Sequence, residues 1–124
     1  QDEAEIVLKS FAQFASIPVI NMESAVGHPL QALADAITLD MHPTKHKPKV
    51  VLSWAPHPKA LPHAVANSFT KMMEFRDAEF VIAQPEGYEL DPRITKNVPV
   101  IHNQEKAIKD ADFVYAKNKF RITA

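Results

Sequence analysis

The amino-acid sequence predicts an α/β fold, a three-layer αβα sandwich around a mainly parallel five-stranded sheet. Short apolar runs rich in Val and Ile alternate along the chain with longer segments of helical periodicity. The runs are apolar throughout, as expected for strands that helices cover on both faces. The length of 124 residues suits one domain, and 46% hydrophobic residues is enough for one core.

The expected elements follow one another in the order of such a sheet. Helices are expected at residues 3–15, 28–40, 62–75 and 104–111, with a short helical segment after Asp91-Pro92. The second helix has Pro29 in its first turn, where a missing amide hydrogen costs nothing. Strands are expected at residues 17–22, 49–54, 79–83, 99–102 and 112–116. Because helices separate most of these strands, a parallel sheet is predicted.

Composition excludes several classes of protein. The 14 Lys and Arg residues are balanced by 15 Asp and Glu residues, so the basic excess of a nucleic-acid-binding protein is missing. The sequence has no cysteine, which excludes disulfides and thiolate metal sites and fits a cytoplasmic protein. No apolar run approaches the roughly 20 residues of a membrane span. The acidic start is unlike a signal peptide, and the missing initial Met and abrupt end favour a fragment.

Common cofactor motifs are also missing. With only two glycines, Gly27 and Gly87, the chain has no glycine-rich phosphate loop. It has no HExxH sequence, no histidine and carboxylate set with metal-ligand spacing, and no GxSxG nucleophile elbow. The sequence therefore predicts neither a bound metal nor a nucleotide cofactor.

Polar residues follow the predicted strands. Ligands of open parallel sheets bind at the carboxyl ends of the strands, so these residues are the default site. They are Glu23, His28, His57, Glu86, His102 and Lys117.

His28 and Gln31 stand three residues apart at the start of the second predicted helix, which places them on one face of its first turn. The free amide groups and partial positive charge of a helix N-terminus suit a carbonyl oxygen or an anion. The alternative is structural, with His28 as a helix cap and Gln31 in solvent.

Three further residues have both a binding and a structural interpretation. Glu23 is suited to hold a substrate ammonium or align an amine, and Lys117 to bind a carboxylate. His57 lies between two prolines, which lower the entropy cost of ordering it against a ligand. For Glu23 and Lys117 the alternative is a solvated charge, and for His57 a loop stiffened for stability.

Several segments of the sequence resemble those of a known family. Residues 19–23 (VINME), followed by His-Pro-Leu-Gln at residues 28–31, resemble the opening of the second domain of aspartate and ornithine carbamoyltransferases. Residues 54–59, 64–68, 85–92 and 112–118 resemble the branch that acts on N-acetylornithine and N-succinylornithine. The five-residue step from Glu23 to His28 is closer to the succinylornithine enzymes. The resemblance covers residues 1–118, an acylornithine-binding domain, while the tail at residues 119–124 departs from the family.

The resemblance implies a Rossmann-like domain of a cytoplasmic carbamoyltransferase of arginine biosynthesis. Such an enzyme transfers the carbamoyl group of carbamoyl phosphate to the δ-amine of N-succinylornithine or N-acetylornithine. Its full-length form is a homotrimer that needs no metal or organic cofactor, and nucleic acid and membrane are not expected partners. The choice between succinyl and acetyl groups stays open.

The same resemblance implies residue roles. His28 and Gln31 would be catalytic, His28 polarising the carbamoyl oxygen and Gln31 orienting the carbamoyl amide. Carbamoyl phosphate would be held by His28, Pro29, Leu30 and Gln31, and the acylated ornithine by Glu23, His57, Asn67 and Lys117.

Two family segments are missing from the sequence, namely the phosphate loop of the first domain and a later His-Cys-Leu-Pro segment. The isolated chain is therefore expected to be inactive. The alternative function is a stand-alone flavodoxin-like domain that binds a small molecule, or regulates, without catalysis.

Overall fold

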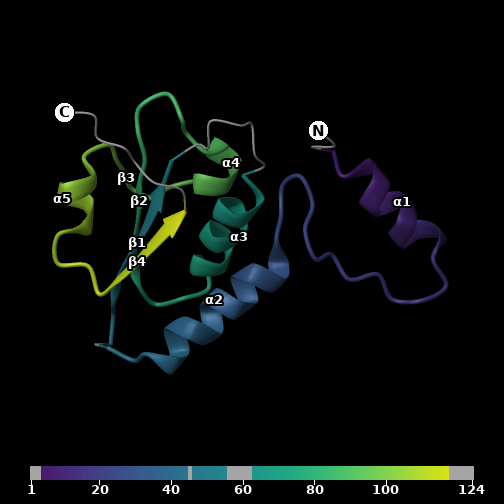
Figure 1. Cartoon of the computed structure of the whole chain (residues 1–124), viewed down its shortest axis with the longest axis horizontal. Helices are drawn as coiled ribbons and strands as arrows, with labels where there is room; N and C mark the ends of the chain where they lie inside the picture. The colour runs from purple at the N-terminus through teal and green to yellow at the C-terminus, as the bar shows by residue number, and fades with distance from the viewer. Residues whose placement is uncertain (1–3, 45, 56–62, 118–124) are drawn as a thin grey trace.

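The computed structural model describes residues 4–44, 46–55 and 63–117 (Figure 1). In chain order the elements are α1 (Ile6–Phe14), α2 (Pro29–Met41), β1 (Lys49–Trp54), α3 (Ala64–Met73), β2 (Glu79–Ala83), α4 (Pro92–Thr95), β3 (Val100–Ile101), α5 (Gln104–Ile108) and β4 (Phe113–Lys117). The predicted helices are all present, although α1, α3 and α5 are shorter than expected, and β3 has only two residues.

The strands form one parallel sheet in the order β3-β2-β1-β4. β1 lies in the centre, with Val51 in register with Val81 of β2 on one side and Val114 of β4 on the other. The predicted α/β class and parallel sheet are confirmed. Because every strand runs the same way, the carboxyl ends of β1, β2 and β4 lie along one edge.

Alternate residues of β1 point to opposite faces of the sheet, and both faces are covered. Val50, Leu52 and Trp54 belong to a buried cluster with Phe69 of α3 and are at most 1% exposed. The intervening residue Val51, also fully buried, packs in a second cluster with a residue of α5. This two-sided burial is the reason that β1 reads as a continuous apolar run.

The strand predicted at residues 17–22 is not formed, so the sheet has four strands among the described residues instead of five. The segment pairs with no strand of the described chain, and Ile17, Ile20 and Met22 are 73%, 71% and 67% exposed. An apolar run becomes a strand only where a neighbour accepts its backbone hydrogen bonds. Residues 17–22 are apolar as the sequence shows, but they are not part of this sheet.

Helix α1 forms as predicted but buries none of its residues. Leu8 is half-buried, but four other apolar side chains are 61–81% exposed, namely Ile6, Val7, Phe11 and Phe14. Figure 1 shows α1 set apart from the αβα body. A hydrogen bond from the Ser24 hydroxyl to the Glu5 carboxylate joins its start to the chain before α2. The helix and residues 17–22 together form an exposed apolar segment over residues 6–22.

Deleting residues 1–22 should leave the stability of the αβα body almost unchanged. None of the described residues in that segment is buried, so we expect the free energy of unfolding to change by no more than about 0.5 kcal/mol, the range of surface changes. Fluorescence of a dye that binds exposed apolar surface should fall. Chemical denaturation and dye titration check both points, with the double substitution Phe11→Glu and Phe14→Glu as a full-length control. A large loss of stability would mean that the segment packs on the body.

No helix in the described ranges is long and apolar enough to cross a membrane. Within the same ranges, no group of three or more His, Asp or Glu residues is placed to hold a metal ion.

Candidate functional site at the carboxyl edge of the sheet

The carboxyl ends of β1 and β4 are joined side by side. Trp54, the last residue of β1, is in register with Lys117, the last residue of β4, and the Ala55 amide donates to the Lys117 carbonyl at 3.2 Å. Helix α3 begins shortly after β1, so its first turns lie at this same edge. Lys117 is half-buried there, at the position where the sequence predicts a substrate contact.

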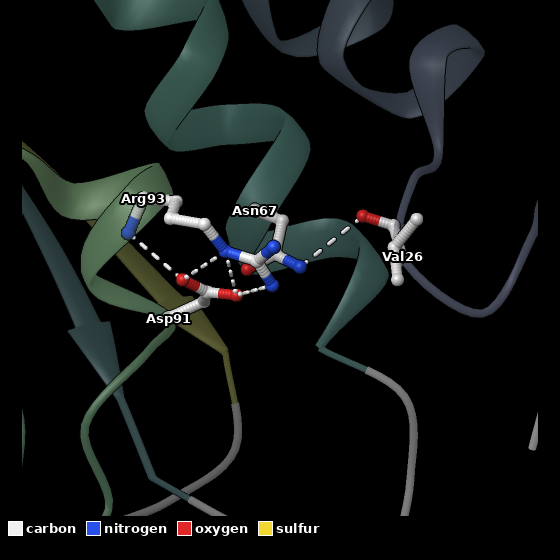
Figure 2. A network of polar contacts seen from close by, with 4 residues as sticks. All are labelled: Val26, Asn67, Asp91 and Arg93. Atoms are coloured by element: carbon white, nitrogen blue, oxygen red, sulfur yellow. Dashed lines mark hydrogen bonds and ion pairs between the residues drawn. The ribbon is translucent and has the colours of Figure 1, made fainter. Parts of the chain in front are cut away.

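The loop before α2 is fastened to the first turns of α3. The Asn67 side chain donates from Nδ2 to the Val26 carbonyl at 3.2 Å (Figure 2), and the His28 amide donates to the Ser68 hydroxyl at 2.7 Å. Within the loop, the Ser24 amide donates to the Gly27 carbonyl at 2.7 Å. These bonds place His28 at the carboxyl edge of the sheet.

Helix α2 then runs along α3 away from this edge. Its far end is fixed by an ion pair between Asp40 and Arg76, which follows the end of α3. Helix α2 therefore holds its first turn, with His28 and Gln31, at the carboxyl edge.

The His28 side chain caps α2. Its Nδ1 accepts a hydrogen bond from the Gln31 amide at 3.3 Å, and Pro29 occupies the first helical position. A ring nitrogen that accepts carries no proton, so the neutral ring has its proton on Nε2. The structural and functional interpretations of His28 are thus compatible, because the cap leaves an Nε2–H donor for a ligand.

Gln31 and Asp35 are linked one turn further along α2. The Gln31 Nε2 donates to Asp35 Oδ1 at 2.9 Å. The cap joins the His28 ring to the Gln31 backbone amide, as the predicted shared first turn requires. The Asp35 carboxylate is a partner of the Gln31 side chain that the sequence analysis did not identify. The i, i+4 spacing on a predicted helix was the available signal.

Asn67 is 6% exposed, and its two polar atoms differ in their surroundings. Nδ2 is used to hold the loop at Val26, whereas Oδ1 is buried without a hydrogen-bond partner. A buried carbonyl oxygen without a partner is unfavourable, so Oδ1 is an unsatisfied acceptor beside the loop that precedes α2. The structure shows Asn67 to have a positioning contact that the sequence did not predict.

The second interaction in Figure 2 is a helix cap. Asp91 accepts from the Arg93 amide at 2.8 Å and pairs with the Arg93 guanidinium at 2.6 Å at the start of α4. The hydrogen bonds from the Arg93 side chain and amide lower the pKa of Asp91 to about 2. The helix cap at the start of α4 therefore accounts for the lowered pKa of Asp91.

Of the remaining predicted site residues, three are exposed and one is not described by the structure. Glu23 and Pro29 are exposed, and Leu30 is 41% exposed, so all three can meet a ligand. His57 lies outside the described residues.

Near Asp35, an aromatic contact connects α3 with the sheet. Tyr115 of β4 stacks on Phe69 of α3, with ring centroids 4.6 Å apart and planes 11° apart. Burial and the nearby Asp35 carboxylate raise the pKa of Tyr115 to about 12. Asp35 and Tyr115 also line a cavity of about 190 Å³ between α2, α3 and β4.

A second cavity, of about 490 Å³, lies at the opposite edge of the sheet. Its lining includes His42, Asp40, Arg76 and Phe113, near the start of β1 and β4. It is therefore separate from the edge that collects His28, Gln31, Asn67 and Lys117, and none of the predicted site residues lines it.

Comparison with known proteins agrees with the resemblance drawn from the sequence. No family model matches the chain. The N-succinylornithine carbamoyltransferase of Bacteroides fragilis is 50% identical over 117 residues, which cover 94% of this chain and 37% of that protein. The N-acetylornithine carbamoyltransferase of Xanthomonas campestris pv. campestris is 38% identical over 133 residues, covering 95% of this chain and 39% of that protein.

Solved structures give the same result. A crystal structure of N-acetyl-L-ornithine transcarbamylase superposes with a TM-score of 0.83 at 37% identity, over 94% of this chain and 40% of that chain. A variant of the same enzyme, complexed with carbamyl phosphate and N-succinyl-L-norvaline, superposes with a TM-score of 0.84 at the same identity and coverage. The predicted resemblance to acylornithine carbamoyltransferases is confirmed, and the chain corresponds to less than half the length of these relatives.

Proposed function

We propose that this chain is the acylornithine-binding domain of a carbamoyltransferase that transfers the carbamoyl group of carbamoyl phosphate to the δ-amine of N-succinylornithine. The observation that carries the proposal is the His28 cap, which leaves the ring Nε2–H free to donate in the same first turn of α2 as Gln31. N-Acetylornithine is the second candidate substrate. Succinyl is preferred because the Bacteroides fragilis relative, at 50% identity, is named for N-succinylornithine.

His28 and Gln31 would act on the carbamoyl group. When the δ-amine attacks the carbamoyl carbon, a C–N bond forms and negative charge develops on the carbamoyl oxygen. The Nε2–H of His28 stabilises that charge as an oxyanion donor. The C–O bond to phosphate then breaks, phosphate leaves with the bonding electrons, and the departing phosphate takes up the proton that the nitrogen loses.

The attacking amine must be neutral. An aliphatic amine of this kind has an intrinsic pKa near about 10, so at neutral pH the site must favour the deprotonated form. Glu23, in the loop before α2, would align the amine, and Lys117 would bind the substrate carboxylate. Asn67 would help to bind the acylated ornithine, with Oδ1 as its unused acceptor. His57 completes this set by resemblance.

The rest of the site would come from the part of the enzyme that the relatives have and this chain does not cover. The exposed apolar segment at residues 6–22 is suited to pack against that part, because its side chains contribute little to the αβα body. We propose a cytoplasmic homotrimer for the full-length protein. The domain alone holds an incomplete site.

A chimeric enzyme tests the proposal. This chain would replace the matching 117 residues of the Bacteroides fragilis enzyme, to which it is 50% identical. We expect the chimera to carbamoylate N-succinylornithine faster than plain ornithine, and the isolated chain to show no turnover. The unaltered Bacteroides enzyme is the control.

Two outcomes would contradict the proposal. A folded chimera that carbamoylates neither acylated ornithine would leave only the fold in common with the relatives. Turnover by the isolated chain would show that its site is complete. If the isolated chain instead bound a small molecule while the folded chimera stayed inactive, the stand-alone binding domain would be the better interpretation.

A further inference from the structure

The hydrogen bond between Gln31 and Asp35 determines which way the Gln31 carboxamide points. A carboxylate oxygen accepts hydrogen bonds, so the group of Gln31 that faces Asp35 Oδ1 at 2.9 Å must be its NH₂. The carbonyl oxygen Oε1 is attached to the same carbon and therefore faces away from Asp35. With an apolar residue at position 35, nothing in this contact would favour one orientation of the amide over the other.

Asp35 is itself held by a rigid frame. It is half-buried on α2, and its carboxylate lies near Tyr115, which stacks on the fully buried Phe69. Its second oxygen, Oδ2, is buried with no hydrogen bond of normal length, and the Tyr115 hydroxyl is a polar group close to the carboxylate. A buried carboxylate that is only weakly hydrogen-bonded lowers stability, so packing alone would favour an apolar residue at this position. This cost favours a role beyond packing.

We propose that Asp35 is a positioning residue that fixes the Gln31 carboxamide with Oε1 toward the carbamoyl site. The inference rests on the proposed function, in which Gln31 contacts the carbamoyl amide. Oε1 then accepts from the NH₂ of the carbamoyl group, while His28 donates to its oxygen. The two side chains together match a carbamoyl group, which has an N–H donor where an acetyl group has only a methyl.

The orientation of the Gln31 carboxamide should affect which acyl phosphate the site prefers to bind. Carbamoyl phosphate offers Gln31 Oε1 an N–H donor, and acetyl phosphate does not. A site with a fixed acceptor should therefore bind carbamoyl phosphate much better than acetyl phosphate. When the Gln31 amide is free to rotate by 180°, its NH₂ faces the carbamoyl NH₂ group part of the time. The preference for carbamoyl phosphate over acetyl phosphate should then become smaller.

The substitution Asp35→Asn tests this in the full-length carbamoyltransferase that carries this sequence. The Asn side chain has nearly the same shape but can either donate or accept, so it no longer fixes the Gln31 amide. We expect kcat/KM for carbamoyl phosphate to fall by up to about tenfold, the size of one lost hydrogen bond between Gln31 Oε1 and the uncharged carbamoyl NH₂. KM for the acylated ornithine should stay unchanged, and inhibition by acetyl phosphate should weaken much less than carbamoyl phosphate binding.

A matched control is available on the same helix. Asp40→Asn also removes one carboxylate from α2, but Asp40 pairs with Arg76 at the end of the helix away from the site. It should leave the ratio of carbamoyl phosphate to acetyl phosphate binding unchanged. Asp35→Ala serves as a second variant if Asp35→Asn does not fold, and melting temperature identifies that case.

The double variant Gln31→Ala with Asp35→Asn shows whether Asp35 acts through Gln31. If it does, Asp35→Asn adds less than about a twofold loss once Gln31 is Ala. Independent losses that multiply would overturn the inference, as would full discrimination between the two phosphates in Asp35→Asn. If Gln31→Ala itself leaves kcat/KM for carbamoyl phosphate unchanged, the proposed role of Gln31 in the function fails instead.

Discussion

In the proposed full-length carbamoyltransferase, replacing His28 by Ala should lower kcat by about 10²–10³-fold, the effect of losing one oxyanion donor. The physical reason is the cap of α2. Because Nδ1 accepts from the Gln31 amide, the neutral ring keeps its proton on Nε2. In the proposed function this proton is donated to the carbamoyl oxygen. Steady-state kinetics with saturating substrates measure the loss.

His28→Asn separates the catalytic effect from the structural one. Asn is among the preferred N-cap residues, so it should keep α2 capped, whereas Ala should cost about 1 kcal/mol of stability. Asn cannot place an imidazole N–H at the position of Nε2. We therefore expect His28→Asn to have near-normal stability with a kcat reduced almost as much as in His28→Ala. A kcat of His28→Asn close to that of the unaltered enzyme would show that His28 only caps the helix.

The sequence was most informative where a local pattern reports a local environment. The apolar runs at β1 and β2 predicted strands with helices on both faces, and residues such as Val51 and Ile82 are fully buried. The spacing of His28 and Gln31 predicted a shared first turn, and the cap joins them. In each case the contacts that fix the structure are made within a few residues of sequence, or are set by the spacing of side chains along a strand or a helix.

Prediction failed where the partner lies elsewhere. Residues 17–22 have the composition of a strand, but a strand also needs a neighbour, and the described chain offers none. Ser68 and Asn67 hold the loop before α2 across about 40 residues of sequence, a contact that no local pattern reports. Asp35 has the spacing of an ordinary solvated pair with Gln31, and only the fold places it beside Tyr115.

The second large effect is expected from Phe69→Ala. Phe69 is 1% exposed, stacks on Tyr115 at 4.6 Å and lies 5.9 Å from the ring of Phe80. Removing a buried aromatic ring should cost about 3–5 kcal/mol, from lost apolar burial and from the cavity that remains. Phe75→Ala is the matched control, because Phe75 is 89% exposed and should change stability by less than about 0.5 kcal/mol.

Phe69→Ala should also disturb the site, because Phe69 supports Tyr115, and Tyr115 lies beside Asp35. Chemical denaturation measures the stability of the variant, and Phe69→Leu replaces it if Phe69→Ala does not fold. A loss below about 1 kcal/mol would show that the core between α3 and β4 repacks freely. In that case Asp35 would have no rigid support. The fixed orientation of Gln31 would then depend on the Gln31–Asp35 hydrogen bond alone.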